Sequence, residues 1–333
     1  MGKTKYIFST GELKRRENSI SFRDTSGRLT HMPIENIREL YLFNEVTINT
    51  KLLQVLSMAG IVMHFFDYYG HYIGTYYPKD YLLSGRLKVQ QALAYSDDRR
   101  LEIAREIVRG TAENISALLY HYYRHEKKEV KPVIDFCGEI SNWLRPAQDI
   151  RQIMSVEGKL WSLFYGTFPM VLHEDFVFSK RVRRPPDNPI NALISFLNSM
   201  LYAKTITMLY HTHLDQTISF LHEPSEARFS LSLDLAEVFK SELVFKTIFD
   251  LVNNRKLRVD KHFDSALNYC LLNEAGRKIV IKAFEERIST TFEHSRLHRK
   301  VRYETAIKYE GYKMIKYLME GKAYHAFSVN KKC

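Results

Sequence analysis

The chain has 333 residues, of which 45% are hydrophobic and 13% aromatic, so it can bury a sizeable core and is not of the disordered class. Its formal net charge is +11, and the last forty residues contribute +7 of this, with ten Lys/Arg against three Asp/Glu. Such a basic surface suits a polyanion, either nucleic acid or an anionic membrane.

The membrane alternative is weaker. The most apolar run that we find, AGIVMHFF, is far shorter than the roughly 20 residues that a span requires. The first residues lack the apolar stretch of a signal peptide, and the three cysteines, Cys137, Cys270 and Cys333, are too far apart for a disulfide framework or a zinc ribbon. We therefore expect a cytoplasmic protein that binds nucleic acid.

The first eighty residues predict a small β domain. Short strand-like runs separated by turn signals such as DTSG and DYYG occur as YIFS, SISF, ELYLF, IVMHFFD and YIGTYY. One stretch, NTKLLQVLSMAG from Asn49, has an N-capping residue, helical apolar spacing and a closing glycine, so it predicts a helix between the strands. We assign residues 1–80 to this domain.

Beyond Tyr77 the pattern becomes helical. PKDYLLSGR carries a proline and a glycine, which places a linker at 81–88, and the later segments have mainly 3.6-residue periodicity. Residues 89–333 are therefore expected to form an α-helical domain. The fold class is α+β, a small N-terminal β-strand domain joined to a larger all-α C-terminal domain.

An imidazole and two carboxylates fall in one short segment, SFLHEPSEARFSLSLDLAEVFKSEL. The alternation of RFSLSL predicts a short strand or extended segment, followed by a helix with Asp234 in its first turn. Asp234 and Glu237 are three residues apart and share a helix face, while His222 lies fifteen residues before Glu237. A helix-dipole aspartate beside a solvated glutamate is the alternative for the pair alone, and the three residues together indicate a site.

Two carboxylates and an imidazole suit Mg²⁺ or Mn²⁺, which also need a further oxygen donor. The best donor is Glu157 in IMSVEGKLWSLFYGTF, because Gly158 is an unusual choice inside an apolar helical stripe and indicates close approach of a backbone or a ligand. An exposed glutamate beside a packing glycine is the alternative. No GxSxG, P-loop or GxGxxG motif is present.

Two basic segments suit phosphate contacts. One is the proline-containing loop FSKRVRRPPDNP, and the other is the start of what we expect to be the last long helix. Their candidate DNA-binding residues are Lys180, Arg181, Arg183, Arg184, Arg296, Arg299, Lys300 and Arg302.

The order of these motifs resembles a known family. The β domain is followed by MSVEGKLWSLFYGTF, RRPPDNPINALISFLNSMLYAKT, FLHEPSEARFSLSLDLAEVFK and YETAIKYEGYKMIKYLMEGKAYHAF. This arrangement resembles the CRISPR-associated integrase and endonuclease of spacer acquisition, the Cas-one family, over nearly the whole chain. The departures are Ser219 in place of a frequent glycine, LISFLN in place of a common LLSFGY, and FKS in place of the usual FRP, which puts a phosphate role for Lys240 in doubt.

The resemblance implies a chemistry, a metal and partners. It implies that Glu157, His222 and Glu237 bind Mg²⁺ or Mn²⁺, with Asp234 as a neighbouring acidic residue of the site. It also implies a homodimer that assembles with a Cas-two dimer on double-stranded DNA and inserts short DNA fragments into the CRISPR array by transesterification. Two roles stay open: His222 is either a metal ligand or a proton acceptor, and Asp234 orients either a metal-bound water or His222. Two other functions also stay open: a nuclease without integrase activity and a non-catalytic nucleic-acid-binding scaffold.

Overall fold

The computed structural model describes residues 2–183, 185–225, 227–266, 269–294 and 298–329. They fall into two compact units, residues 1–83 and 84–333. The first is built mainly of strands and the second mainly of helices, which confirms the predicted α+β class. Helix α2 (Gly85–Ser96) begins inside the expected 81–88 linker, because the Ser84 side chain accepts a hydrogen bond from the Leu87 N–H and caps the helix there.

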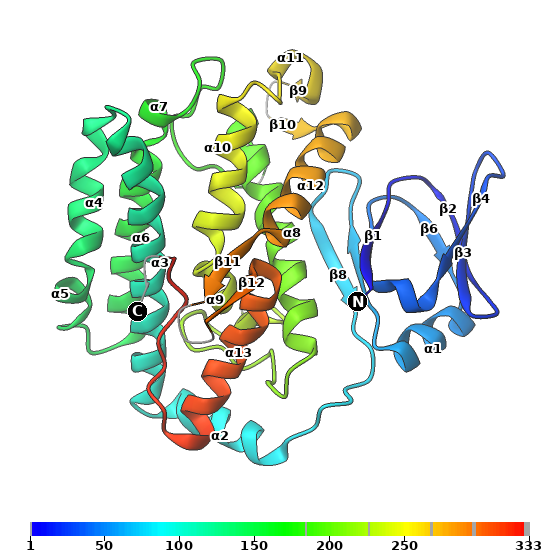
Figure 1. The fold of residues 1–333 in the computed structure, drawn as a ribbon, viewed down its shortest axis with the longest axis horizontal. Helices are drawn as coiled ribbons and strands as arrows, with labels where there is room; N and C mark the ends of the chain where they lie inside the picture. Colours follow the sequence, from blue (N-terminus) through cyan, green and yellow to red (C-terminus); the bar gives the residue numbers. More distant parts are fainter. Residues whose placement is uncertain (1, 184, 226, 267–268, 295–297, 330–333) are drawn as a thin grey trace. The chain divides into compact units, whose positions relative to one another are not determined.

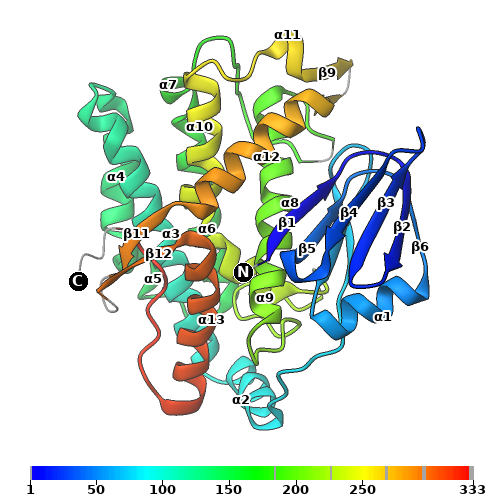
Figure 2. The same ribbon diagram turned by 45° about the vertical axis from the view of Figure 1, so that its right-hand side comes forward.

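Two four-stranded sheets make up the N-terminal unit, drawn in blue (Figures 1 and 2). In one sheet three parallel strands are followed by an antiparallel edge strand, in the order β1 (Lys3–Ile7), β5 (Ile37–Leu42), β7 (Val62–Phe66) and β8 (Tyr72–Tyr76). The other contains an antiparallel meander and a strand parallel to β2, in the order β4 (Leu29–Pro33), β3 (Ser19–Asp24), β2 (Gly11–Arg16) and β6 (Val46–Ile48).

Helix α1 (Thr50–Ala59) completes the core of this unit. The Asn49 side chain accepts a hydrogen bond from the Leu52 N–H at 3.0 Å, and Gly60 ends the helix in the left-handed conformation. The helix expected from Asn49 is therefore confirmed. Leu52 packs in one cluster with Leu13 and Leu40 of the two sheets, and all three side chains are fully buried. A short 3₁₀ turn, Ile34–Asn36, precedes β5.

Strands β1, β3, β5, β7 and β8 lie where the sequence predicts strands, whereas β2, β4 and β6 were not predicted. In β2, GELKRR, Leu13 is the only buried residue. Its charged side chains give no apolar alternation, so the sequence pattern does not predict this strand, which pairs with β3 on one edge and β6 on the other.

The helical unit is built around helices that are far apart in sequence. Helices α3, α4 and α6 pack on one another, and α8 packs against α9, α10 and α13 (Figure 1). The remaining bounds are α3 (Arg99–Arg124), α4 (Lys131–Gly138), α5 (Ile140–Leu144), α6 (Ile150–Gly166), α7 (Phe168–Val171), α8 (Pro189–Tyr210), α9 (Ser230–Glu237), α10 (Lys246–Asn253), α11 (Val259–His262), α12 (Glu274–Ser289) and α13 (Tyr303–Glu320). Two hairpins, β9 (Phe263–Ala266) with β10 (Tyr269–Leu272) and β11 (Thr291–His294) with β12 (Arg299–Arg302), and a 3₁₀ turn, Lys128–Val130, complete it.

Helix α8 has the length and apolar composition of a membrane span. However, 83% of its most apolar window is buried inside the structure, as in a core helix. Asn188 caps it by accepting a hydrogen bond from the Asn191 N–H at 2.9 Å, and Pro189 occupies its first position. This helix is longer than the apolar run AGIVMHFF that stands out in the sequence.

Two local predictions are wrong. RFSLSL does not form a strand, because α9 begins at Ser230 and places Asp234 in its second turn. This helix is buried on almost every side, so alternation does not mark a sheet face. The helix expected to run on past Glu237 is interrupted by a turn at Val238 and Phe239 and continues as a π-helical turn, Ser241–Phe245, before α10.

The last long helix also begins later than expected. It starts at Tyr303, and Arg299, Lys300 and Arg302 lie instead on strand β12, which pairs with β11. The sequence does not reveal this hairpin, because its exposed basic residues carry no apolar alternation.

Candidate functional site

Glu157 lies in the middle of α6. This helix is capped by Asp149, whose side chain accepts a hydrogen bond from the Gln152 N–H at 2.8 Å. Ile153, Leu160 and Phe164 form its buried stripe. Glu157 is half-buried beside this stripe, and the Trp161 side chain, one turn later, donates a hydrogen bond to its carboxylate.

Asp234 is fully buried and uses both carboxylate oxygens on one short segment of the preceding loop. Its Oδ2 accepts hydrogen bonds from the backbone N–H groups of Phe220 at 2.6 Å and Leu221 at 2.9 Å. Its Oδ1 accepts from the His222 N–H at 2.9 Å and from His222 Nδ1 at 2.9 Å. One carboxylate thus fixes the backbone around His222 and the orientation of its ring, and leaves Nε2 as the free ring nitrogen.

The protonation of His222 follows from this contact. Burial disfavours the imidazolium, but the hydrogen bond from Nδ1 to Asp234 and the negative charges of Asp234 and Glu237 favour it more strongly, so the pKa of His222 rises to about 9. The side chain is 15% exposed. It is therefore a protonated, oriented imidazole at neutral pH when only these side chains surround it.

Glu237 is the last residue of α9, and its side chain is 5% exposed. Its Oε1 accepts a hydrogen bond from the Lys240 ammonium, which also lies 5.4 Å from the centre of the Trp161 ring. Its Oε2 is buried and has no hydrogen-bond partner among the residues that the structure describes. An unsatisfied buried carboxylate oxygen costs free energy, which a bound cation or donor would recover.

Glu157 and Glu237 interact electrostatically across the site. Burial and then the negative charge of Glu237 raise the pKa of Glu157 to about 7, although Lys240, His222 and Trp161 act in the opposite direction. Two carboxylates that repel each other, with a nearby imidazole, are a donor set that fits a hard divalent cation. In the described part of the chain, no three His, Cys, Asp or Glu side chains lie close enough together to hold a metal ion, so Glu157, His222 and Glu237 would have to move closer to one another to bind one.

The structure adds three residues that the sequence did not identify as part of the site. Lys240 pairs with Glu237, Trp161 covers Glu157, and Tyr165 lies one turn beyond Trp161 within the electrostatic reach of both glutamates. Burial raises the pKa of Tyr165 to about 12, so its hydroxyl stays protonated. The spacing of Glu157, Trp161 and Tyr165, four residues each, was the available signal, because such residues share a helix face.

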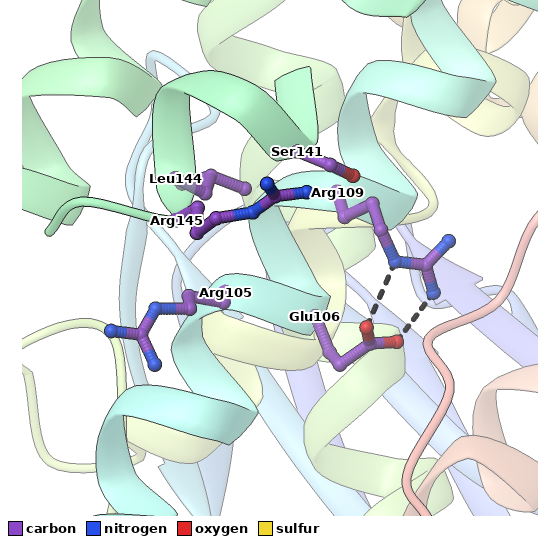
Figure 3. A pocket seen from close by; sticks show the side chains of 6 residues that line it. All are labelled: Arg105, Glu106, Arg109, Ser141, Leu144 and Arg145. Carbon is purple, nitrogen blue, oxygen red and sulfur yellow. Dashed lines mark hydrogen bonds and ion pairs between the residues drawn. The ribbon is translucent and has the colours of Figure 1, made fainter. Parts of the chain in front are cut away.

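Gly158 does not serve the close backbone approach that its position suggested. A Cβ atom at this position would lie more than 4 Å from every described atom outside its own stretch of helix. A separate hollow of about 300 Å³ lies on α3 and α5, lined by Arg105, Glu106, Arg109, Ser141, Leu144 and Arg145 (Figure 3). None of the predicted site residues that the structure describes lines it.

The basic residues divide into different environments. Lys180 and Arg183 are exposed in the loop before α8, and Arg299, Lys300 and Arg302 are exposed on β12. Arg181 differs: its guanidinium donates to Asn191 Oδ1 at 3.1 Å and to Ser195 Oγ at 2.9 Å, so it anchors the loop to α8 instead of facing solvent. Arg184 and Arg296 lie outside the described residues.

Comparisons with known proteins agree with this architecture. The family model "CRISPR associated protein Cas1" matches residues 5–286. A CRISPR-associated endonuclease Cas1 from Thermodesulfovibrio yellowstonii is 40% identical over 98% of this chain and 99% of its own. Another, from Pyrococcus horikoshii, is 41% identical over 94% of each chain.

Solved structures share the fold. A CAS1 protein from Thermotoga maritima has a TM-score of 0.84 and 34% identity, and the match covers 98% of this chain and 100% of that one. A casposase bound to an integration product has a TM-score of 0.86 at 19% identity, over 99% of this chain and 94% of the casposase. The resemblance expected from the ordered motifs is confirmed, and this chain belongs to the Cas1 family of CRISPR-associated proteins.

Proposed function

We propose that this protein is the DNA integrase and endonuclease of CRISPR spacer acquisition, which inserts short DNA fragments into the CRISPR array. The observation that carries the proposal is the electrostatic repulsion between half-buried Glu157 and buried Glu237, whose Oε2 lacks a hydrogen-bond partner among the described residues, near an imidazole held by Asp234. Membership of a family whose matched relatives are named endonucleases supports it.

The reaction is a transesterification at phosphorus. The 3′-hydroxyl oxygen of the incoming fragment loses its proton and forms a new P–O bond, while the P–O bond to the leaving 3′-hydroxyl of the array strand breaks and that oxygen takes up a proton. Water in place of the fragment gives hydrolysis. No side chain has to form a covalent bond with the phosphodiester. The site therefore acts by placing charge and proton acceptors around the phosphate.

Glu157, Glu237 and Nε2 of His222 would hold Mg²⁺ or Mn²⁺, and the ion would polarise the scissile phosphate and stabilise its developing charge. Asp234 is assigned a positioning role, because its oxygens are already committed to the loop and to Nδ1. Lys240 neutralises Glu237 when no other cation is near. Tyr165 and Trp161 shield this part of α6 from water.

The partners follow from the family and the charge. Neighbours of the same fold include a Cas1–DNA complex and complexes of Cas1 with Cas2. We assign this chain double-stranded DNA, a Cas2 dimer and a second copy of itself as partners in the cytoplasm. Residues 1–80 would mediate dimerisation, and residues 89–333 would bind DNA and perform the chemistry. Lys180, Arg183, Arg299, Lys300 and Arg302 would contact phosphates without reading bases.

A strand-transfer assay tests the proposal. A labelled fragment with free 3′ ends is incubated with a plasmid carrying the cognate repeat and with Cas2, in Mn²⁺, Mg²⁺ or EDTA, using wild type, Glu157→Ala and His222→Ala. We expect label to enter the plasmid only in the reactions that contain both the wild type and a divalent metal. Plasmid nicking without label would identify a nuclease that does not integrate. DNA binding without any metal-dependent reaction, unchanged in the variants, would identify a scaffold.

A further inference from the structure

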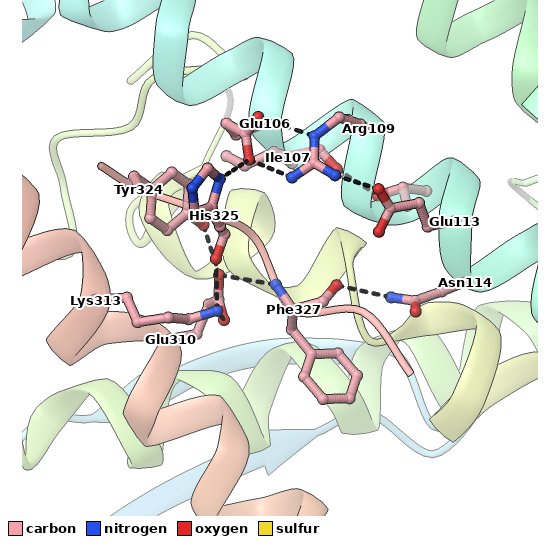
Figure 4. Close-up of polar contacts among 11 residues, drawn as sticks. Glu106, Ile107, Arg109, Glu113, Asn114, Glu310, Lys313, Tyr324, His325 and Phe327 are labelled. Atoms are coloured by element: carbon pink, nitrogen blue, oxygen red, sulfur yellow. Dashed lines mark hydrogen bonds and ion pairs between the residues drawn. The ribbon is translucent and has the colours of Figure 1, made fainter. Parts of the chain in front are cut away.

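The described chain ends in an extended segment that returns along α3. Gly321, with φ of 67°, ends α13 in the left-handed conformation and lets the chain reverse. Residues 324–329 form a C-terminal strap (Figure 4), in which Tyr324, Ala326 and Phe327 are buried, with exposures of 4%, 2% and 8%. A terminal segment with three buried side chains and defined partners is part of the folded unit.

One end of the strap is held by α13. Glu310 Oε1 accepts hydrogen bonds from the Tyr324 hydroxyl at 2.7 Å and from the Phe327 N–H at 3.2 Å. Lys313 pairs with Glu310 Oε2 at 2.6 Å and donates to the His325 carbonyl at 2.7 Å. His325 Nδ1 also lies 3.3 Å from Glu106 Oε2 on α3.

The other end is joined through α3 to the proposed site. Asn114 is fully buried, and its Oδ1 accepts a hydrogen bond from the Val329 N–H at 2.9 Å. Its Nδ2 donates to two carbonyls, that of Phe327 at 3.0 Å and that of Val238 at 2.7 Å. One amide therefore connects the strap to the residue that directly follows Glu237.

The same junction is closely packed. The Phe327 ring stacks on the Phe239 ring, with centroids 4.7 Å apart and planes 19° from parallel. A Cβ atom at Gly110 of α3 would lie 2.7 Å from Ala326 Cβ, 3.1 Å from the Phe327 carbonyl oxygen and 3.5 Å from Val238 Cγ1. The glycine thus allows the strap, α3 and Val238 to meet at one point.

Val238 and Phe239 form the turn between α9 and the π-helical turn Ser241–Phe245. Such an interruption breaks the regular hydrogen-bond ladder. The Phe239 N–H and carbonyl still find local partners in Ala236 and Leu243, whereas the Val238 carbonyl accepts its hydrogen bond from the distant Asn114 side chain. Glu237 precedes the turn and Lys240 follows it. A displacement of the turn would therefore move both members of the ion pair in the site.

We propose that the C-terminal strap is a positioning element of the catalytic centre: through Asn114 and Phe327 it fixes the Val238–Phe239 turn and thereby the Glu237 carboxylate. The role of Glu237 rests on the proposed function, whereas the hold of the strap on the turn does not. Misplacement of a reacting group by about 1 Å can cost roughly 100-fold in rate, so support from a distant segment can matter for the chemistry.

The test compares full-length wild type with Phe327→Ala, Phe327→Leu, Asn114→Ser and a matched control, Tyr324→Phe. The control loses a hydrogen bond in the same strap, but to Glu310 and not to the turn. Amide hydrogen exchange of residues 238–245 is measured without metal, with α8 as the internal reference for global stability. Mn²⁺ affinity is measured by calorimetry.

We expect Phe327→Ala and Asn114→Ser to increase exchange in 238–245 at least tenfold relative to α8 and to weaken Mn²⁺ binding at least tenfold. Phe327→Leu should restore much of both, and Tyr324→Phe should change neither. If the alanine and serine variants match Tyr324→Phe in both measurements, the strap is only structural and the inference is wrong.

Two further outcomes are informative. If the wild type binds no Mn²⁺ but the variants still exchange faster in 238–245, the metal-dependent function is refuted. The inference that the strap holds the turn would stand. If Phe327→Ala does not fold, Asn114→Ser provides the same comparison, because it removes the amide that joins the strap to the turn and leaves the Phe327 ring in place.

Discussion

Residues of the same chemical type have different tasks in this site because their partners differ. The Asp234 carboxylate is satisfied by the loop that it holds, whereas Glu237 keeps one buried oxygen without a hydrogen-bond partner and Glu157 has a raised pKa of about 7. Satisfied acceptors stabilise the fold, and unsatisfied ones provide ligand capacity. Substitutions at Asp234 and Glu157 should therefore have opposite effects on stability.

At Asp234 we predict that replacement by Asn is destabilising. An amide offers one acceptor oxygen, and its NH₂ group would face N–H donors that now bond to the carboxylate. We expect the free energy of unfolding to fall by about 2–4 kcal/mol. The pKa of His222 should drop from about 9 toward its usual range, because the hydrogen bond and charge of Asp234 raise it.

Urea unfolding and an NMR titration of the His222 ring would measure both effects. Asp260→Asn is the control, because Asp260 is exposed and pairs with Arg258 at the surface. That variant should leave the stability unchanged within the error of the measurement. An unchanged His222 pKa in Asp234→Asn would contradict the assigned positioning role.

Glu157→Gln should stabilise the metal-free protein at high pH. The pKa of Glu157 is about 7 in the folded state and 4.5 without its surroundings, so the unfolded chain ionises first as pH rises. The contribution of this group to stability is thus present below pH 4.5 and is lost between about 4.5 and 7, a loss of about 3 kcal/mol. Glutamine removes this loss.

In EDTA at pH 8, Glu157→Gln should exceed wild type in the free energy of unfolding by about 2–3 kcal/mol, and the two should converge near pH 4.5. The titration of His222 is present in both proteins and largely cancels. Strand transfer should be lost in the variant. Glu174→Gln, an exposed control, should match wild type at both values of pH. Equal stability of wild type and Glu157→Gln at pH 8 would show that ionised Glu157 does not destabilise the folded protein.

At the scale of elements, two glycines in helices make opposite predictions. Gly110→Ala in α3 would push a methyl group to within 2.7 Å of Ala326 Cβ and 3.1 Å of a carbonyl oxygen, so we expect a loss of about 1–3 kcal/mol. Gly158→Ala in α6 meets no atom within 4 Å and should gain about 0.5–1 kcal/mol from helix propensity. Thermal unfolding of both variants decides, and a gain for Gly110→Ala would show that the strap is not tightly packed on α3.

Substitution of Gly158 also tests whether DNA approaches α6 closely. If Gly158→Ala is more stable but binds DNA several-fold more weakly, the space beside Glu157 is used by the substrate. If affinity is unchanged, Gly158 has no role in binding. Calorimetry or anisotropy with one duplex measures this directly, with wild type and Gly110→Ala as references.

Helix α1 and the strands with apolar alternation were predictable, because local patterns specify them. Strand β2 and hairpin β11–β12 were not, because charged residues line them and pairing with other strands decides their conformation. The three ligand candidates and Asp234 were proposed first from residue type and spacing and then from motif order, and their roles remain predictions. The partners Lys240 and Asn114 were not predicted. Lys240 lies three residues after Glu237, so this ion pair left a local signal that was missed, whereas the bond from Asn114 to Val238 joins residues 124 positions apart and leaves no local pattern.

At the scale of the whole molecule, the net charge of +11 is a weak predictor of where DNA binds, because many cations are paired or committed to the fold. Arg181 is bonded to α8, and Lys313 to Glu310 and the strap. Strand β12 instead presents Arg299, Lys300 and Arg302 to solvent, although Arg299 also donates a hydrogen bond to the Tyr309 hydroxyl. Location should therefore matter more than charge for binding to DNA.

We predict that changing Arg299, Lys300 and Arg302 together to Gln weakens duplex binding and lowers the slope of log affinity against log salt by about 0.9 for each phosphate that the protein no longer neutralises. The control changes Arg15, Arg16 and Arg23, which are exposed in the N-terminal unit, and removes the same charge. Fluorescence anisotropy between about 50 and 200 mM salt measures both. If the two triple variants lose affinity and slope equally, only the total charge attracts DNA. A lower slope confined to the β12 variant would show that phosphates contact this strand, since a contact that releases no counterion leaves the slope unchanged.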